Sequence, residues 1–327
     1  MRWCWRALSA ASVATVLLVA LAMLLFTPGA AIAGQSETVW HPHPGDPAAL
    51  ARMYDVSRSA MQGAGAPYAQ WAGQGRQFLA FSSRGNGRIV EVFGDLAAAD
   101  RIAVLVPGVS TTANNFSTGL DDVRDRAPAV QARALYDATR AANPGQHVAV
   151  IAWLGYDAPQ GVGRAAAREE LARAGASALD GFTRDLAILR PRARVTLIGH
   201  SYGSVVTGLA AANLPAQVKD LVVVGSPGMG VSRAADLHTS ARVWAGQSAQ
   251  DWIDWVPAFK VWGAGHGTLP VTAGFGARVF GTTGVIDHDH YLAPGTQSLG
   301  NIVEIVLGRD SGVSAPSSPA LPGQASG

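Results

Sequence analysis

The sequence Gly-His-Ser-Tyr-Gly at residues 199–203 places a serine where it could act as a nucleophile. A serine hydroxyl attacks a carbonyl efficiently only when a neighbouring base removes its proton. Residues 194–198 before it are rich in apolar and β-branched side chains and predict a buried strand, whereas the small apolar residues 202–212 predict a helix. The flanking glycines let strand and helix approach closely. We therefore predict a nucleophile elbow with Ser201 at its apex, in preference to an ordinary glycine-rich turn.

Candidates for the acidic partner lie downstream of this serine. The strand–elbow–helix unit is typical of the α/β-hydrolase fold, in which an acid and then a histidine follow the serine along the chain. Asp251 and Asp254 both come after a predicted strand at residues 241–245. We favour Asp251 because it is nearer the end of that strand, and Asp254 is the alternative. If it is not catalytic, either aspartate would be a helix cap or a solvated loop carboxylate.

Candidates for the base come later still. His288 and His290 precede a final helix predicted at residues 296–307, where this fold carries its catalytic histidine, so both are better placed than His266. His200 neighbours the serine in sequence, but its side chain should project in another direction. We therefore expect His200 to be a packing residue.

Two backbone N–H groups are needed to stabilise the oxyanion that forms when a serine attacks an ester. One is expected from Tyr202, the residue after the nucleophile. The other is expected from the loop at residues 107–112, which follows a predicted strand at residues 102–106. Because Gly108 permits a tight turn in this loop, Val109 is the predicted second donor.

The run Asp-His-Asp-His at residues 287–290 also resembles a set of metal ligands. Alternate residues of a strand share one face, so this run would present either its carboxylates or its imidazoles, which is an incomplete set. The sequence has no second cluster at matching spacing, no phosphate-binding loop and no dinucleotide fingerprint. We therefore expect no metal and no cofactor.

Several further motifs resemble one known family, the actinobacterial α/β-hydrolases long classed as a domain of unknown function. The resemblance covers about residues 100–308 and implies a hydrolase-type site. Its spacing His-x-x-Tyr, found here as His288 and Tyr291, favours His288 over His290. Leu269 and Asp289 depart from the family, which has an acidic residue and a serine at these positions. The motifs that carry the resemblance are at residues 106–108, 153–159, 199–204, 224–228, 275–277 and 288–296.

The elements expected around these residues alternate between strand and helix. Such alternation predicts a mostly parallel sheet covered by helices on both faces. We assign residues 34–75 to an N-terminal helical segment, 76–309 to the α/β-hydrolase domain and 310–327 to a disordered tail rich in Ser, Pro, Ala and Gly. A hairpin is predicted at residues 78–92. The predicted strands are 102–106, 147–152, 194–198, 220–225 and 241–245, and the predicted helices 128–142, 163–189, 202–212 and 296–307.

Tryptophans gather around the acid candidates. We expect Trp244, Trp252, Trp255 and Trp262 either to pack in the core or to form the apolar wall of an acyl pocket, with residues 252–285 as a small cap. Tyr156 and Asp157 are candidates for the opposite wall, and a plain loop carboxylate is the alternative for Asp157.

The N-terminal sequence indicates the cellular location of the protein. Basic residues at positions 2 and 6, an uncharged apolar run at 7–26 and Ala-Ile-Ala at 31–33 are typical of a cleaved signal peptide at residues 1–33, with a membrane anchor as the alternative. Cys4 is the only cysteine, so the chain has no internal disulfide. We expect an exported protein that is extracellular or associated with the cell envelope.

Charge and motifs together favour one function. The formal net charge is +2 and no basic stripe is present, which argues against nucleic-acid binding. The expected activity is hydrolysis of a small-molecule or lipid ester through an acyl-enzyme on Ser201. The alternatives are acyl transfer to an alcohol by the same residues and a non-catalytic exported binding module.

Overall fold

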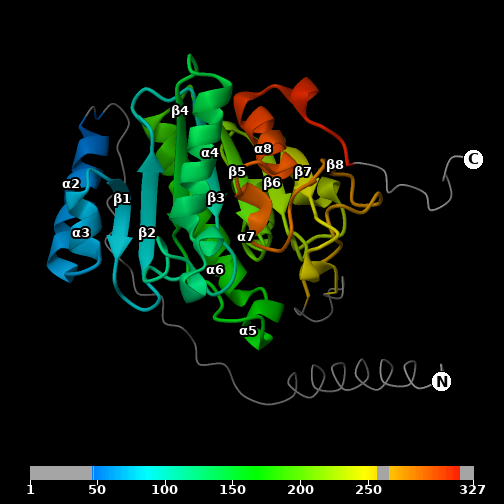
Figure 1. Ribbon diagram of the computed structural model, residues 1–327, viewed down its shortest axis with the longest axis horizontal. Helices are drawn as coiled ribbons and strands as arrows, with labels where there is room; N and C mark the ends of the chain where they lie inside the picture. Colours follow the sequence, from blue (N-terminus) through cyan, green and yellow to red (C-terminus); the bar gives the residue numbers. More distant parts are fainter. Residues whose placement is uncertain (1–45, 47, 256–264, 317–327) are drawn as a thin grey trace, which may run out of the picture. The chain divides into compact units, whose positions relative to one another are not determined.

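Figure 1 shows a computed structural model in which residues 46, 48–255 and 265–316 are described. The predicted signal peptide or anchor at residues 1–33 lies outside these residues. Among the helices that are described, none has the length and apolar character required to cross a membrane.

An eight-stranded sheet runs through the domain in the order β1-β2-β4-β3-β5-β6-β7-β8. Strand β2 is antiparallel to both of its neighbours, and all pairs from β4 to β8 are parallel. The strands are β1 Gln77–Ser82, β2 Arg88–Phe93, β3 Arg101–Val106, β4 Val148–Leu154, β5 Arg194–His200, β6 Val218–Val224, β7 Arg242–Gly246 and β8 Arg278–Val279. The predicted mostly parallel sheet is confirmed.

Helices cover both faces of the sheet. Helices α4 and α8 pack together on one face, and α6 and α7 pack together on the other (Figure 1). Central strands buried on both faces need continuous apolar sequences, and accordingly every residue of β4 is buried. The helices are α2 Ala49–Ala64, α3 Tyr68–Gly73, α4 Pro128–Ala142, α5 Arg164–Ala167, α6 Glu170–Leu189, α7 Gly203–Ala210 and α8 Gln297–Leu307.

Two elements differ from the prediction. The helix expected over residues 163–189 is broken between α5 and α6, because Arg168 is extended, with φ −106° and ψ 154°. Strand β8 was not predicted, since its paired residues Arg278 and Val279 are too few to create a pattern. Short 3-10 turns connect the longer elements, and those used below are η2 Arg124–Arg126 and η6 His290–Leu292.

The prediction of a disordered tail is wrong for residues 310–316. Ser314 accepts a backbone hydrogen bond from Gly281 at 2.9 Å and donates one to the side chain of Asn301 at 2.7 Å. Asp310 forms ion pairs with Arg242 and Arg278. Short polar residues give no periodic pattern of apolar side chains, so the sequence could not predict these contacts. Residues 317–327 lie outside the described part.

Candidate active site

Ser201 lies at the sharp turn between β5 and α7. Its φ of 54° is in the left-handed region, which is rare for a residue with a side chain. The turn is tight because a Cβ on Gly199 would lie 2.7 Å from the Cα of Ser204, and a Cβ on Gly203 would lie 2.1 Å from the carbonyl oxygen of Val106. The Ser201 amide donates to the Val224 carbonyl at 3.0 Å. The local sequence therefore forms the elbow geometry, with the serine at a strained apex.

Asp251 and His288 lie together although 37 residues separate them in the chain. Asp251 follows β7 and His288 precedes η6, and Nδ1 of His288 is 2.8 Å from Oδ1 and 3.0 Å from Oδ2 of Asp251. Burial alone would raise the pKa of Asp251, but hydrogen bonding and charge from His288 outweigh it, and the net direction is down. Asp251 is therefore an ionised carboxylate fixed against one nitrogen of the imidazole.

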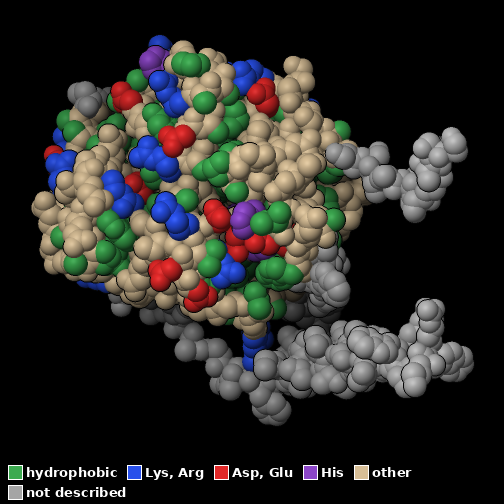
Figure 2. Space-filling model, in the orientation of Figure 1, with side chains coloured by type: hydrophobic (Ala, Val, Ile, Leu, Met, Phe, Trp, Pro, Cys, Tyr) green, Lys and Arg blue, Asp and Glu red, His purple; other side chains and the backbone are tan. Residues whose placement is uncertain are grey.

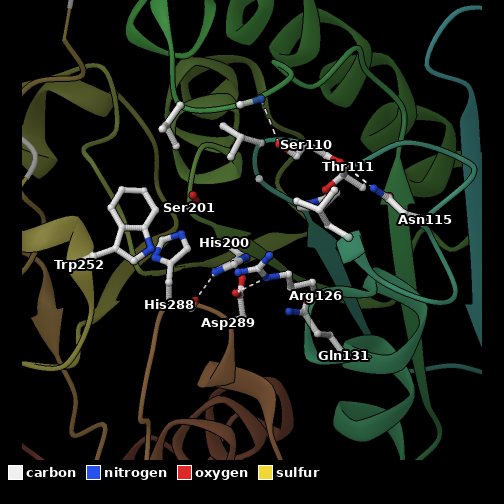
Figure 3. A pocket seen from close by; sticks show the side chains of 16 residues that line it. Ser110, Thr111, Asn115, Arg126, Gln131, His200, Ser201, Trp252, His288 and Asp289 are labelled. Carbon is white, nitrogen blue, oxygen red and sulfur yellow. Dashed lines mark hydrogen bonds and ion pairs between the residues drawn. The ribbon is translucent and has the colours of Figure 1, made fainter. Parts of the chain in front are cut away.

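The other nitrogen of His288 faces the same cavity as Ser201. Nε2 of His288 is buried and has no hydrogen-bond partner among the described residues, so no hydrogen bond joins it to the serine hydroxyl. Figure 3 shows the imidazole of His288 between the hydroxyl of Ser201 and the indole of Trp252, whose ring centroid is 4.7 Å from that of His288. Hydrogen bonds of this kind often tighten only when substrate is bound.

His200 packs against the base and also holds it. Its Nε2 donates to the carbonyl oxygen of His288 at 2.7 Å, and the two ring centroids are 4.9 Å apart. Burial, and secondarily the neighbouring imidazole of His288, lower the pKa of His200 to about 4. His200 is therefore neutral near pH 7. The sequence indicated packing for this residue but gave no sign of the hydrogen bond.

The remaining candidates are engaged elsewhere or lie outside the described residues. Nε2 of His266 donates to the Ala166 carbonyl at 2.7 Å. His290 pairs with Asp287 at 2.6 Å and with Asp125 at 3.2 Å. Neither histidine lines the cavity that holds Ser201. The side chain of Asp254 is not among those described.

Tyr291 is a site residue whose role the sequence did not reveal. Its hydroxyl donates to Oδ2 of Asp251 at 2.7 Å and accepts from the Ser248 amide at 3.0 Å. The ring is buried. Tyr291 therefore holds one of the two carboxylate oxygens that His288 also contacts, and the spacing His-x-x-Tyr was its only signal.

The two predicted oxyanion donors lie near the nucleophile. Neither the N–H of Tyr202 nor that of Val109 donates to another residue in the described part of the chain. The loop that carries Val109 runs against the serine, because a Cβ on Gly108 would lie 2.6 Å from the Cβ of Ser201. The hydroxyl of the fully buried Tyr156 donates to the Pro107 carbonyl at 2.6 Å and supports this loop.

The predicted opposite wall of the cavity is wrong. Tyr156 lies beneath the loop rather than in the cavity, and Asp157 forms a paired ion contact with Arg88 at 2.7 Å. Trp252 does line the cavity, whereas Trp244 is buried in β7 with its Nε1 donating to Asp220. Trp262 lies outside the described residues, and so does the side chain of Trp255.

A cavity of about 250 Å³ contains the site. Of the described part of the predicted cap at 252–285, only Trp252 lines it; residues 267 and 275 instead bond to the segment 231–234. The cavity residues are Pro107, Gly108, Val109, Ser110, Thr111, Asn115, Leu120, Arg126, Gln131, Gly161, Val162, His200, Ser201, Trp252, His288 and Asp289.

The side chains of the acidic and imidazole run at residues 287–290 bond to each other and to η2. Asp287 bonds to His290, and Asp289 accepts from Arg126 at 2.7 Å. Within the described ranges, no group of His, Cys, Asp or Glu side chains is arranged to hold a metal ion.

The parallel sheet, the turn at Ser201 and the order of serine, acid and histidine along the chain together define an α/β hydrolase. A family model described as alpha/beta hydrolase matches residues 82–261, and the chain belongs to this family. The family predicted from the motifs is thus confirmed.

Relatives with curated sequences are uncharacterized mycobacterial proteins. One from Mycobacterium tuberculosis H37Rv is 31% identical over 266 residues, covering 73% of this chain and 40% of the relative. One from Mycobacterium bovis is 37% identical over 147 residues, covering 44% of this chain and 53% of the relative. The chain therefore spans about half or less of the length of these relatives.

Solved structures with similar folds include serine hydrolases. A Xanthomonas campestris α/β serine hydrolase without a lid aligns with a TM-score of 0.40 at 16% identity, covering 75% of this chain and 98% of that structure. Esterase PE8 aligns with a TM-score of 0.41 at 18% identity, covering 66% of this chain and 96% of that structure.

Proposed function

We propose that this α/β hydrolase cleaves a carboxylic ester through an acyl-enzyme on Ser201. The observation that supports the proposal is a buried Asp251–His288 pair whose free imidazole nitrogen faces the cavity of a strained serine. A base held by a carboxylate beside such a serine is the arrangement that activates a hydroxyl.

The proposed reaction runs in two halves. Ser201 Oγ attacks the ester carbonyl while Nε2 of His288 takes the hydroxyl proton, and Asp251 stabilises the imidazolium that forms. The N–H groups of Tyr202 and Val109 hold the oxyanion. His288 then gives the proton to the departing alcohol. Water repeats the sequence on the acyl-serine and releases the acid.

Reaction with a fluorophosphonate tests the nucleophile. We expect wild type to be labelled and Ser201→Ala not to be.

Turnover of an aryl ester then tests the base. His288→Gln should lose at least 10³-fold in kcat/KM, the scale of removing one triad member. The neighbouring His290→Gln serves as the matched control and should retain activity. Absence of labelling in folded wild type contradicts the proposal and favours a binding module. Product analysis with added glycerol separates hydrolysis from acyl transfer.

We further propose that the protein is exported. The support is the sequence of residues 1–33, with its basic start, apolar run and Ala-Ile-Ala site. Intact mass of protein recovered outside an actinobacterial host tests this: a chain beginning at Gly34 is expected. A full-length chain in the membrane fraction supports the anchor instead, and a full-length chain in the cytoplasm contradicts export.

A further inference from the structure

The cavity around Ser201 has an uneven distribution of polar groups. Figure 3 shows Trp252 and His288 on one side of Ser201, and Thr111, Arg126 and Gln131 on the other. Trp252 is 43% exposed, so part of its indole is free to contact a ligand. An ester whose carbonyl lies at Ser201 therefore meets an indole on one side and hydrogen-bonding groups on the other, while Val109, Leu120 and Val162 also line the cavity.

The hydrogen-bonding side of the cavity has donors and acceptors without a partner among the described residues. Nε of Arg126 donates to Oδ2 of Asp289 at 2.7 Å, but its terminal amino groups donate to none of the described residues, and the nearest further carboxylate is Asp121 at 3.7 Å. The hydroxyl of Thr111 is on a buried side chain that lines the cavity and bonds to no described residue. These groups offer donors and acceptors to a ligand.

The charges on this side select against ions. Arg126 and Asp289 neutralise each other, and further carboxylates of Asp121, Asp125 and Asp287 lie close by. Of these groups, only Arg126 and Asp289 line the cavity, so an anionic ligand would meet the carboxylate of Asp289 and a cationic one the guanidinium of Arg126. A neutral ligand avoids both penalties.

An alkyl chain fits this side poorly. It would displace water from Arg126, Thr111 and Asp289 and give no hydrogen bond in return, which is costly for charged groups above all. A hydroxyl group donates and accepts, so it can bond to the guanidinium, the carboxylate or the threonine.

We propose that the natural substrate is an ester that joins a neutral, hydroxyl-rich group, such as a sugar or polyol, to an apolar part. The hydroxyl-rich group binds beside Arg126, and the apolar part lies against Trp252. The inference rests on the proposed ester hydrolysis at Ser201.

Matched esters that differ only in hydroxyl content test this assignment. One pair carries the hydroxyls on the alcohol: glucose 6-butyrate against tetrahydropyran-2-ylmethyl butyrate. The other carries them on the acid: methyl gluconate against methyl hexanoate. We expect kcat/KM to favour the hydroxylated member of one pair by at least tenfold, and that pair identifies which half of the ester lies beside Arg126. The proposal is overturned if neither pair shows this preference.

Single substitutions test whether Arg126 and Thr111 cause the preference for hydroxylated esters. Arg126→Met should lower the kcat/KM ratio of the favoured pair about tenfold or more, the effect of losing a hydrogen bond to a charged group. Arg124→Met removes the same charge from η2 at an exposed residue that does not line the cavity, and should leave the ratio unchanged. If Arg126→Met does not fold, Thr111→Val removes a hydroxyl at nearly constant volume and should also lower the ratio. A ratio unaffected by both wall variants contradicts the assignment.

Turnover of p-nitrophenyl butyrate separates a failure of the substrate assignment from a failure of the proposed ester hydrolysis. If wild type hydrolyses this ester but prefers neither hydroxylated substrate, the substrate assignment fails and the ester hydrolase stands. If folded wild type neither hydrolyses it nor reacts with a fluorophosphonate, the proposed function itself fails.

Discussion

The carboxylate of Asp251 is held from several directions at once. The Ile253 amide donates to Oδ1 at 2.9 Å, Tyr291 donates to Oδ2, and His288 bonds to both oxygens. A carboxylate fixed in this way keeps the imidazole in one orientation without reorganising during the reaction. We therefore propose Tyr291 as a positioning residue that acts through Asp251.

Replacing Tyr291 with Phe removes only the hydroxyl. We expect kcat to fall about three- to tenfold with KM nearly unchanged, because the hydroxyl aligns the catalytic pair and lies outside the cavity. Steady-state kinetics on an aryl ester measure this. Tyr136→Phe, on α4, is the matched control and should behave like wild type. A change confined to KM would contradict the positioning role.

Gly225 provides the space in which the acid and base meet. It has a φ of 54°, and a Cβ there would lie 2.9 Å from Oδ2 of Asp251 and 3.1 Å from Cε1 of His288. Gly225→Ala should therefore lower the free energy of unfolding by roughly 1–3 kcal/mol and reduce kcat more than tenfold.

Urea unfolding and kinetics measure these two effects. Gly181→Ala is the control, because that glycine is inside α6 with no atom within 4 Å of the added Cβ. It should raise the free energy of unfolding by about 0.5–1 kcal/mol and leave kcat unchanged. Equal behaviour of the two variants would show that crowding at Gly225 is unimportant.

The sequence predicted some site residues because chain order constrains them. Ser201 has a local signature, and chain order favours Asp251 after a strand and either His288 or His290 before a helix. The family spacing His-x-x-Tyr favoured His288, and the structure puts Asp251 and His288 in hydrogen-bond contact. The pair formed by Arg126 and Asp289 left no such signature, since 163 residues separate its members. Contacts of this kind depend on how loops meet in space, which periodicity does not report.

At the scale of elements, two ion pairs connect the loop that carries His288 to η2. His290 pairs with Asp125, and Arg126 with Asp289, across the junction. Figure 2 shows acidic side chains gathered around a histidine on the face of the molecule that it draws. The hydrogen bond to Asp287, opposed in part by burial, raises the pKa of His290. Burial would raise the pKa of Asp287, but the bond from His290 contributes to a net decrease.

The stability that His290 contributes should therefore depend on pH. A raised pKa means that the contribution is full below the unfolded value, about 6.5, and is lost as pH rises through the folded value. His290→Gln should lower Tm by about 2 °C at pH 6, as expected for a partly exposed pair, and by less at pH 9. Calorimetry at both pH values measures the difference.

His147→Gln is the control for this titration. His147 is exposed and takes part in no ion pair within the described part of the chain. Its substitution should shift Tm equally at pH 6 and pH 9. A pH-independent shift for His290→Gln as well would contradict the role assigned to its charge.

The elements themselves were predicted to differing degrees. The parallel strands were found because strands buried on both faces are continuous apolar runs. The break before α6 was missed because residues 164–176 keep helix-forming side chains on both sides of it. Propensity cannot register a single extended residue whose conformation depends on tertiary contacts.

At the scale of the whole molecule, residues 310–316 complete the edge of the domain beyond β8. They connect α8, β7 and the segment at Gly281 through Ser314 and Asp310. A chain ending at Arg309 should lose these hydrogen bonds and ion pairs, and its Tm should fall by about 5 °C. The control chain, ending at Pro316, keeps all of these contacts and should have the higher Tm of the two. Equal Tm values for the two truncated chains would contradict the contribution of residues 310–316.

Half of the cavity wall and the proposed acid–base pair come from separate stretches of the chain. Residues 110–131 and 161–162 supply eight of the sixteen residues that line the cavity, whereas Asp251 and His288 follow β7 and precede α8. Changes of ligand preference can therefore accumulate in the former without disturbing the proposed proton transfer in the latter. Transplanting residues 110–131 between homologues, which leaves the proposed oxyanion donor Val109 in place, should accordingly exchange their selectivity.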